Sequence, residues 1–268
     1  MQGKPVITLT TDFGCEDPFA GIMKGVIRGI NSDIEIIDIT HGISPQDIQT
    51  AAYVIGTSFS YFPPNSIHVV VVDPGVGSER RPIMVMTDHH YFIGPDNGVF
   101  SYIYRMRHEQ LEVTHITAEH YFLPSRGATF HGRDVFAPVA AYFSKGIRPE
   151  KFGELVTDQR SIPLPFPRLT EDGRLHGEVI HIDRFGNAIT NISASDMDRL
   201  GAPKDWARLK VMVKGREAPL RQFYSEGADR GLYVLVNSAD YIEFFTYRGN
   251  AASEYGIAVG DGVEVFPE

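Results

Sequence analysis

The sequence predicts an α/β domain, built on a wound, mostly parallel sheet with flanking helices, followed by an all-β, barrel-like domain. Strand-like runs at residues 6–11, 34–38 and 67–72 alternate with helical patterns, which is typical of a parallel sheet with crossover helices. Four consecutive valines, Val69 to Val72, indicate a strand buried on both faces of that sheet. Beyond residue 173 the chain changes to short β-branched and aromatic runs separated by turn residues, as in a small barrel or sandwich.

Helix signals separate the first three predicted strands. Asp17-Pro18 is expected to start the first helix, with Asp17 as its cap and an apolar face that runs to Ile30. Ser44-Pro45 is expected to cap the second helix, with Asp47 in its first turn. These starts lead the chain from each strand onto a helix and back, as a wound sheet requires.

The rest of the α/β domain shows weaker signals. A short helix is expected at about residues 99–107, and the turn at residues 88–90 (DHH) is expected to be solvated rather than metal-binding. A last helix follows the sequence FHGRD, which places His131 at or just before a helix start. Further strands are expected at residues 82–87, 91–94 and 111–116.

The proline pattern indicates where the two domains meet. We expect the α/β domain at residues 1–160, a proline-rich linker at 161–173 and the β-barrel domain at 174–268. Prolines on alternate positions of the linker forbid a helix and favour an extended tether. Strands of the barrel domain are expected at residues 174–183, 187–193, 207–214, 231–237, 241–247 and 262–266.

Composition narrows the class of partner. The chain has 268 residues, a net charge of -9 and no run of lysine or arginine, so binding to nucleic acid or to an anionic membrane surface is not expected. No segment approaches the ~20 apolar residues of a membrane span, and the chain enters a strand almost at once, so we expect a cytoplasmic protein. Cys15 is the single cysteine, which excludes intrachain disulfides. A small-molecule partner fits this composition.

Several strands of the α/β domain end in polar clusters. These are TTDFG at residues 10–14, DITH at 38–41, DPGVG at 73–77 and PDNG at 95–98. Open α/β sheets bind ligands at the carboxyl edge of their strands, so the clusters predict a site there. The alternative for Asp73 is ordinary Asp-Pro-Gly turn chemistry. His131, if kept neutral at a helix start, could accept a proton or orient a water, although it could also simply cap the helix.

Phosphate and zinc motifs are incomplete. The DFG at residues 12–14 lacks the other kinase motifs, DPGVG is neither a Walker A nor a GxGxxG sequence, and there is no HExxH. A metal-dependent hydrolase stays open as an alternative, because a scattered set of side chains could bind magnesium or manganese: Asp12, His41, Asp73, His131 and Asp134.

The segment DRFGNAITN at residues 183–191 of the barrel domain combines a carboxylate, an aromatic ring and an amide within one turn. Such groups suit a nucleoside, with the carboxylate on ribose hydroxyls, the ring on the base and the amide on a polar edge. A tight hairpin turn at Gly186 is the structural alternative.

Taken together, these segments resemble the S-adenosyl-L-methionine hydroxide adenosyltransferase family, whose relatives include fluorinases and chlorinases. The likeness runs in order from about Val6 to Val265. The segments that carry it are ITLTTDFG (7–14), the stretch 18–26 ending in MKGV, IIDITHGISPQDIQTAA (36–52), VVVVDPGVGSERR (69–81), FIGPDNG (92–98), FHGRDVFAPVAA (130–141), IDRFGNAITNI (182–192), NSADY (237–241) and GNAA (249–252).

The resemblance implies a hydrolase that converts S-adenosyl-L-methionine and water to adenosine and L-methionine by displacement at C5′. It implies a homotrimer with sites between subunits, and no cofactor or metal. The family's water-handling triad falls on Asp73, Arg80 and His131, with Arg81 as the neighbouring alternative to Arg80. Substrate contacts carried over by motif are Asp12, Asp183, Phe185, Asn187, Ser238, Glu243 and Ala251.

The sequence departs from the halogenating relatives at three places. They carry an uncharged residue at the position of Asp73, an aromatic residue at that of His131 and, in the fluorinating relatives, a tryptophan at that of Gln46. A carboxylate would repel a halide, so the resemblance implies water as the nucleophile. A non-catalytic adenosine or S-adenosyl-L-methionine sensor remains the second alternative.

Overall fold

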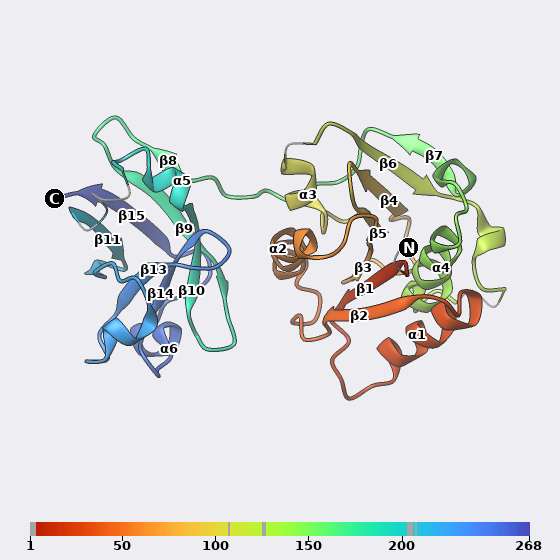
Figure 1. The fold of residues 1–268 in the computed structure, drawn as a ribbon, viewed down its shortest axis with the longest axis horizontal. Coiled ribbons are helices and arrows are strands. Elements are labelled where there is room, and N and C mark those ends of the chain that lie inside the picture. Colours follow the sequence, from red (N-terminus) through yellow and green to blue (C-terminus); the bar gives the residue numbers. More distant parts are fainter. Residues whose placement is uncertain (1–3, 107, 125–126, 203–205, 207) are drawn as a thin grey trace. The chain divides into compact units, whose positions relative to one another are not determined.

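The structure, a computed structural model, describes residues 4–106, 108–124, 127–202, 206 and 208–268 (Figure 1). The chain divides into two compact units, residues 1–163 and 164–268. The second unit begins before the β-barrel domain predicted from residue 174. Part of the predicted linker, Arg168–Leu169, forms strand β8 and pairs with strand β9 (Leu175–Ile182).

A seven-stranded sheet forms the centre of the first unit, in the order β2-β1-β3-β5-β4-β6-β7. β1 pairs in parallel with β2 and β3, and β3 pairs in parallel with β5. Because β4 is antiparallel to β5 and β6, and β7 to β6, only β4 and β7 oppose the common direction. This confirms the predicted fold class. The strands are β1 (Val6–Thr11), β2 (Glu35–Thr40), β3 (Ile67–Val71), β4 (Pro82–Thr87), β5 (Tyr91–Pro95), β6 (Leu111–Ile116) and β7 (Gly153–Val156).

Helices cover both faces of this sheet (Figure 1). On one face, α1 (Phe19–Ile30) and α4 (Ala137–Ser144) pack on a core that contains Val69 and Val71. The other core contains Val70 and Val72 together with residues of α2 (Ile48–Ser58) and α3 (Ser101–Arg105). The four valines thus alternate between two cores, as the continuous apolar run predicts. Short helical turns of the chain lie at η1 (Phe59–Tyr61), η2 (Glu119–Tyr121), η3 (Gly132–Phe136), η4 (Pro149–Lys151) and η6 (Tyr224–Gly227).

Both predicted helix starts come too early, by one residue for α1 and by three for α2. Asp47 is the cap of α2, and its Oδ1 accepts a hydrogen bond of 2.9 Å from the backbone N–H of Thr50. Gln46 has a φ of 69°, a left-handed conformation that separates Ser44-Pro45 from the helix. Pro18 occupies the cap position of α1, which has no side-chain cap.

The prediction of a solvated turn at residues 88–90 is wrong for His90, which is 8% exposed. Its Nδ1 lies 3.2 Å from Nε2 of His68, a fully buried residue of β3 whose Nδ1 lies 2.8 Å from the Thr8 hydroxyl. Burial lowers the pKa of His68 from 6.5 to about 3, so this ring stays neutral. The turn sequence is polar, but the neighbouring strand supplies a partner that only the fold reveals.

The second unit is a curled antiparallel sheet around its own core. Its strand order is β12-β11-β15-β9-β10-β14-β13. The two end strands meet through residues 219–221, because Val234 of β13 donates to the carbonyl of Pro219 and accepts from the N–H of Arg221. The other elements are β10 (Ala188–Ser193), α5 (Ala194–Met197), β11 (Leu209–Val213), β12 (Arg216–Glu217), β13 (Tyr233–Val236), β14 (Tyr241–Phe245), α6 (Ala251–Tyr255) and β15 (Gly262–Pro267).

Among the described residues, no helix has the length and apolar character needed to cross a bilayer.

Candidate active site

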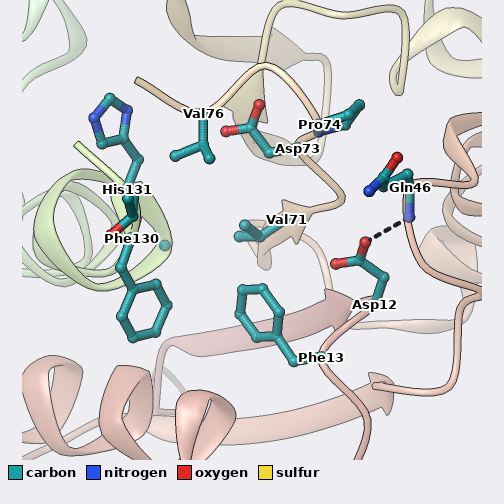
Figure 2. Close-up of a pocket in the computed structure, with 11 residues that line it drawn as sticks. Asp12, Phe13, Gln46, Val71, Asp73, Pro74, Val76, Phe130 and His131 are labelled. Atoms are coloured by element: carbon teal, nitrogen blue, oxygen red, sulfur yellow. Dashed lines mark hydrogen bonds between the residues drawn. The ribbon is translucent and has the colours of Figure 1, made fainter. Parts of the chain in front are cut away.

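The predicted strand ends meet at a pocket at the carboxyl edge of the first unit's sheet. Thr11 and Val71 are register partners at the ends of the parallel strands β1 and β3, so Asp12 and Asp73 leave the sheet close together. They border a cavity of about 290 Å³ (Figure 2). Its lining residues are Asp12, Phe13, Gln46, Val71, Asp73, Pro74, Val76, Thr129, Phe130, His131 and Gly132.

Asp73, Arg80 and His131 form one hydrogen-bonded group. Arg80 Nε donates to Asp73 Oδ1 at 2.9 Å, and Arg80 Nη2 donates to Asp73 Oδ2 and to Nδ1 of His131, the latter at 2.9 Å. A guanidinium can only donate, so Nδ1 is the acceptor and the proton of a neutral His131 ring is on Nε2. The geometry therefore sets the tautomer of this histidine.

Within this group, Asp73 and His131 line the pocket and Arg80 lies behind them. The guanidinium of Arg80 also covers the ring of Phe136, with its Cζ 5.2 Å from the ring centroid. Arg81 points elsewhere and pairs with Asp96 at 2.6 Å and with Asp158 at 2.7 Å. The structure thus brings Arg80, and not Arg81, to Asp73.

A glycine in each of the two segments that carry this group allows a close approach. Gly77 has a φ of 78°, and a Cβ there would lie 2.3 Å from the carbonyl oxygen of Ala128. A Cβ on Gly132 would lie 3.1 Å from Sδ of Met23. Gly132 begins the π-helical turn η3, in which the N–H of Ala137 donates to the Gly132 carbonyl, and such turns are frequent at functional sites.

Three aromatic rings pack together at the pocket, and two of them line it. Phe13 follows Asp12, and Phe130 precedes His131; their ring centroids are 5.7 Å apart in an edge-to-face arrangement. Phe19 at the start of α1 completes the cluster, 5.6 Å from Phe13 and 5.3 Å from Phe130. The sequence analysis missed Phe13 and Phe130 as lining residues, although each adjoins a predicted site residue.

Across the pocket from His131, Asp12 is oriented by the backbone of Gln46. The N–H of Gln46 donates to Asp12 Oδ2 at 2.8 Å (Figure 2). The left-handed conformation of Gln46 turns this N–H toward the pocket edge. One oxygen of Asp12 is therefore fixed, and the carboxylate borders the cavity.

The set considered for magnesium or manganese is brought together only in part, because Asp12, Asp73 and His131 border the pocket while Asp134 and His41 do not. Asp134 pairs with Arg133 at 2.6 Å and accepts from the N–H of Gly127 at 2.8 Å. His41 contacts Thr11 and Asp38 instead of the pocket. No three His, Cys, Asp or Glu side chains of the described residues are placed to hold a metal ion.

In the second unit, the predicted contact Asp183 organises its own turn. Its Oδ1 accepts from the N–H groups of Phe185 and Asn187 at 2.8 and 2.9 Å, and its Oδ2 accepts from Nδ2 of Asn187 at 3.1 Å. Gly186 has a φ of 84°, and Asn250 packs where its Cβ would be. The turn presents the ring of Phe185, which is 75% exposed.

Glu243 is buried beside this turn at 4% exposure. It accepts hydrogen bonds from the Tyr224 hydroxyl at 2.7 Å and from Nδ2 of Asn237 at 3.0 Å, two partners that the sequence analysis missed. Burial raises the pKa of Glu243. Ser238 lies next to Asn237 in the exposed turn between β13 and β14.

Ala251, the last of the predicted contacts, begins α6 and is buried. Its neighbour Ala252 donates to the carbonyl of Gly186 at 2.9 Å, which ties the GNAA segment to the turn at residues 183–187. Within the second unit, these predicted contacts therefore belong to neighbouring segments.

The fold and the pocket define an α/β protein whose cavity lies at the carboxyl edge of its sheet, beside groups able to orient a water. The chain belongs to the SAM hydroxide adenosyltransferase family, where SAM is S-adenosyl-L-methionine. The model of the family's N-terminal domain matches residues 7–153 and that of its C-terminal domain matches residues 177–264. The family resemblance stated from the sequence is confirmed.

Individual relatives agree with this membership. An (R)-S-adenosyl-L-methionine hydrolase of Methanocaldococcus jannaschii is 34% identical, covering 97% of this chain and 95% of the relative. A fluorinase of Nocardia brasiliensis is 24% identical, covering 98% and 97%. The crystal structure of an uncharacterized conserved protein from Thermotoga maritima matches with a TM-score of 0.89 at 31% identity, covering 97% of this chain and 99% of that one.

Proposed function

We propose that this protein hydrolyses S-adenosyl-L-methionine to adenosine and L-methionine, with water attacking C5′ and methionine leaving from the sulfonium. The observation that carries the proposal is the Asp73–Arg80–His131 group at the pocket, in a chain whose full-length relatives include (R)-S-adenosyl-L-methionine hydrolases. A carboxylate and an imidazole beside a pocket are groups that handle a proton of water.

The Asp73–Arg80–His131 group activates water in the transition state and does not hold hydroxide beforehand. Producing hydroxide at pH 7 requires lowering the pKa of water from about 15.7 by roughly 9 units, or about 12 kcal/mol. Zinc approaches this, but one guanidinium and one imidazole do not. A general base contributes typically about 10²- to 10⁴-fold, and in-line positioning against an activated sulfonium supplies the rest.

The tautomer of His131 indicates which residue accepts the proton of the water and which orients it. Its Nδ1 already accepts from Arg80, and the Nε2–H of the neutral ring can only donate. The carboxylate of Asp73 keeps lone pairs beyond those that accept from Arg80, so Asp73 takes the proton of the attacking water. His131 orients the water oxygen. Arg80 does not border the pocket and is a positioning residue that orients the carboxylate of Asp73.

We place the ribose against Asp12, whose carboxylate borders the same pocket. The second unit contributes the base and amino-acid contacts, through Phe185 and Asn187 on the turn that Asp183 holds, and through the neighbouring Ser238, Glu243 and Ala251. We further propose a homotrimer in which each site combines the first unit of one subunit with the second unit of another. Catalysis needs no metal ion, because the Asp73 carboxylate is paired with the guanidinium of Arg80, whose positive charge repels cations.

The configuration at sulfur belongs to the proposal. The hydrolase relatives are named for (R)-S-adenosyl-L-methionine, and since "L" describes the α carbon, "(R)" describes the sulfonium. We therefore expect the (R) sulfonium epimer to be the preferred substrate.

The test is incubation of the purified protein with each sulfonium epimer in isotope-labelled water, with chromatographic and mass-spectrometric identification of products. We expect adenosine labelled at the 5′ oxygen, methionine, and no 5′-halogenated product in chloride or fluoride. Tight binding without turnover would instead indicate the sensor. Adenosine that carries no label would refute attack by water.

A further inference from the structure

A second network of polar side chains lies next to the pocket, and the proposed function gives this network no role. It begins at Lys24 of α1, whose Nζ donates to Asp38 Oδ2 at 2.6 Å. Asp38 Oδ1 lies 3.1 Å from Nε2 of His41, a close contact that is not aligned as a hydrogen bond. His41 Nδ1 lies 2.8 Å from the hydroxyl of Thr11, at the end of β1. This network thus runs from the surface of a helix to a buried strand end.

The direction of each hydrogen bond follows from the chemistry. The carboxylate of Asp38 only accepts, so a neutral His41 ring turns its Nε2–H toward Asp38 and keeps Nδ1 as an acceptor. The Thr11 hydroxyl therefore donates to Nδ1, and its oxygen accepts from the N–H of Phe13 at 3.3 Å. Phe13 thus donates to Thr11 and Thr11 donates to His41, so these two hydrogen bonds run in one direction.

The polar network ends on the loop that forms one wall of the pocket. Thr11 holds the N–H of Phe13, and the carbonyl of His41 accepts from the N–H of Gly14 at 2.8 Å. Between these two contacts lie Asp12 and Phe13, both of which line the pocket. His41 therefore holds the wall on both sides of Asp12, although its own side chain stays outside the cavity.

We propose that Thr11 and His41 are positioning residues that hold the Asp12–Phe13 wall of the pocket in its binding conformation. The part of this inference that concerns ribose binding by Asp12 rests on the proposed function; the part that concerns the conformation of the wall does not. Loss of the Thr11–His41 hydrogen bond then weakens substrate binding more than it slows the chemical step.

The sheet offers two matched controls. Thr10 is as fully buried as Thr11, but its hydroxyl has no hydrogen-bond partner among the described residues. His68 repeats the pair at 2.8 Å with the Thr8 hydroxyl, three residues earlier on β1 and away from the pocket. Thr10→Val and His68→Gln therefore report the cost of changing a buried threonine or histidine without touching the wall.

The histidine can also be replaced in two ways. In His41→Asn, the amide oxygen is two bonds from Cβ, as Nδ1 is in histidine, so it can still accept from Thr11. In His41→Leu, the acceptor is lost and the size is retained. Because the Gly14 contact uses the backbone of His41, both substitutions leave it in place.

The experiment measures amide hydrogen exchange at Phe13 and Gly14 without any ligand, and steady-state kinetics with S-adenosyl-L-methionine. We expect Thr11→Val and His41→Leu to exchange about tenfold faster at Phe13 and to raise KM about tenfold with kcat changed less. His41→Asn, Thr10→Val and His68→Gln should keep both values near those of the wild type.

The two readouts separate the inference from the proposed function. Unchanged exchange at Phe13 in both Thr11→Val and His41→Leu overturns the inference, as does a failure of His41→Asn to restore it. If the wild type does not turn over S-adenosyl-L-methionine, the proposed function fails, while accelerated exchange in the two variants still supports positioning of the wall.

Discussion

Gly77 lies so close to Ala128 that a Cβ on residue 77 would sit 2.3 Å from the Ala128 carbonyl oxygen. This contact joins the loop that carries Asp73 and Arg80 to the segment that leads to His131. The hydrogen bond of 2.9 Å between Arg80 and His131 depends on that approach.

Gly77→Ala should therefore separate the two segments. The substitution adds a left-handed backbone strain of about 1–2 kcal/mol and a backbone clash that no side-chain rotation relieves. We expect kcat to fall more than about tenfold in a folded protein. Gly146→Ala is the control, because Gly146 has a φ of 89° but open space around its Cβ position. Equal losses of activity in the two variants would show that the contact with Ala128 has no role.

The two adjacent arginines give a second prediction. Arg80 holds both oxygens of Asp73 and the ring of His131 with one planar group, which a lysine ammonium cannot reproduce. We expect Arg80→Lys to lower kcat about tenfold or more with a small change in KM. Arg81→Lys should leave kcat near that of the wild type, because Arg81 pairs with Asp96 and Asp158. Steady-state kinetics of the two variants decide which arginine serves the site.

How much of this site the sequence could predict depends on the range of the interactions. Apolar runs that stop at Asp12 and Asp73 mark strand ends, so both carboxylates could be placed at one edge of the sheet. The partner of His41 could not be found, because it depends on how β1 and β2 pair in space. The left-handed conformation of Gln46 could not be predicted either, since glutamine rarely adopts it and the local sequence does not signal it.

The buried histidine predicts an acid-sensitive stability. The folded-state pKa of His68 is about 3, against 6.5 in the unfolded chain, because burial disfavours the charged ring. Below pH 6.5 the unfolded state binds the proton and the folded state does not, so this stability is complete above pH 6.5. It is lost as the pH falls toward 3, by up to about 1.4 kcal/mol per pH unit.

Urea unfolding at several pH values checks this prediction. In His68→Gln, which cannot titrate, the free energy of unfolding should fall less steeply between pH 6 and pH 4 than in the wild type. Identical slopes in the two proteins would show that His68 is protonated in the folded state.

Chelation tests the proposed metal-free chemistry. Asp73 and Asp134 are each paired with an arginine, which leaves few carboxylate lone pairs and adds positive charge near them. We expect turnover of S-adenosyl-L-methionine to survive exhaustive dialysis against EDTA, and added magnesium or manganese to leave the rate unchanged. Activity that returned only with a divalent ion would favour the metal-dependent hydrolase.

The last prediction concerns sites shared between subunits. Asp73→Asn should abolish most turnover by removing the proton acceptor from the first unit. Asn187→Ala should abolish binding by removing a group from the second unit. If each site combines the first unit of one subunit with the second unit of another, a mixed trimer contains some sites in which both residues are intact.

Random mixing of equal amounts restores about a quarter of the sites, because each half of a site is intact with a probability of about one half. We therefore expect two nearly inactive variants to recover roughly a quarter of wild-type turnover after they are unfolded and refolded together. Variants refolded separately and then mixed are the control, since their subunits have not exchanged. A site built within one subunit would always contain one defective half, and co-refolding would then restore no activity.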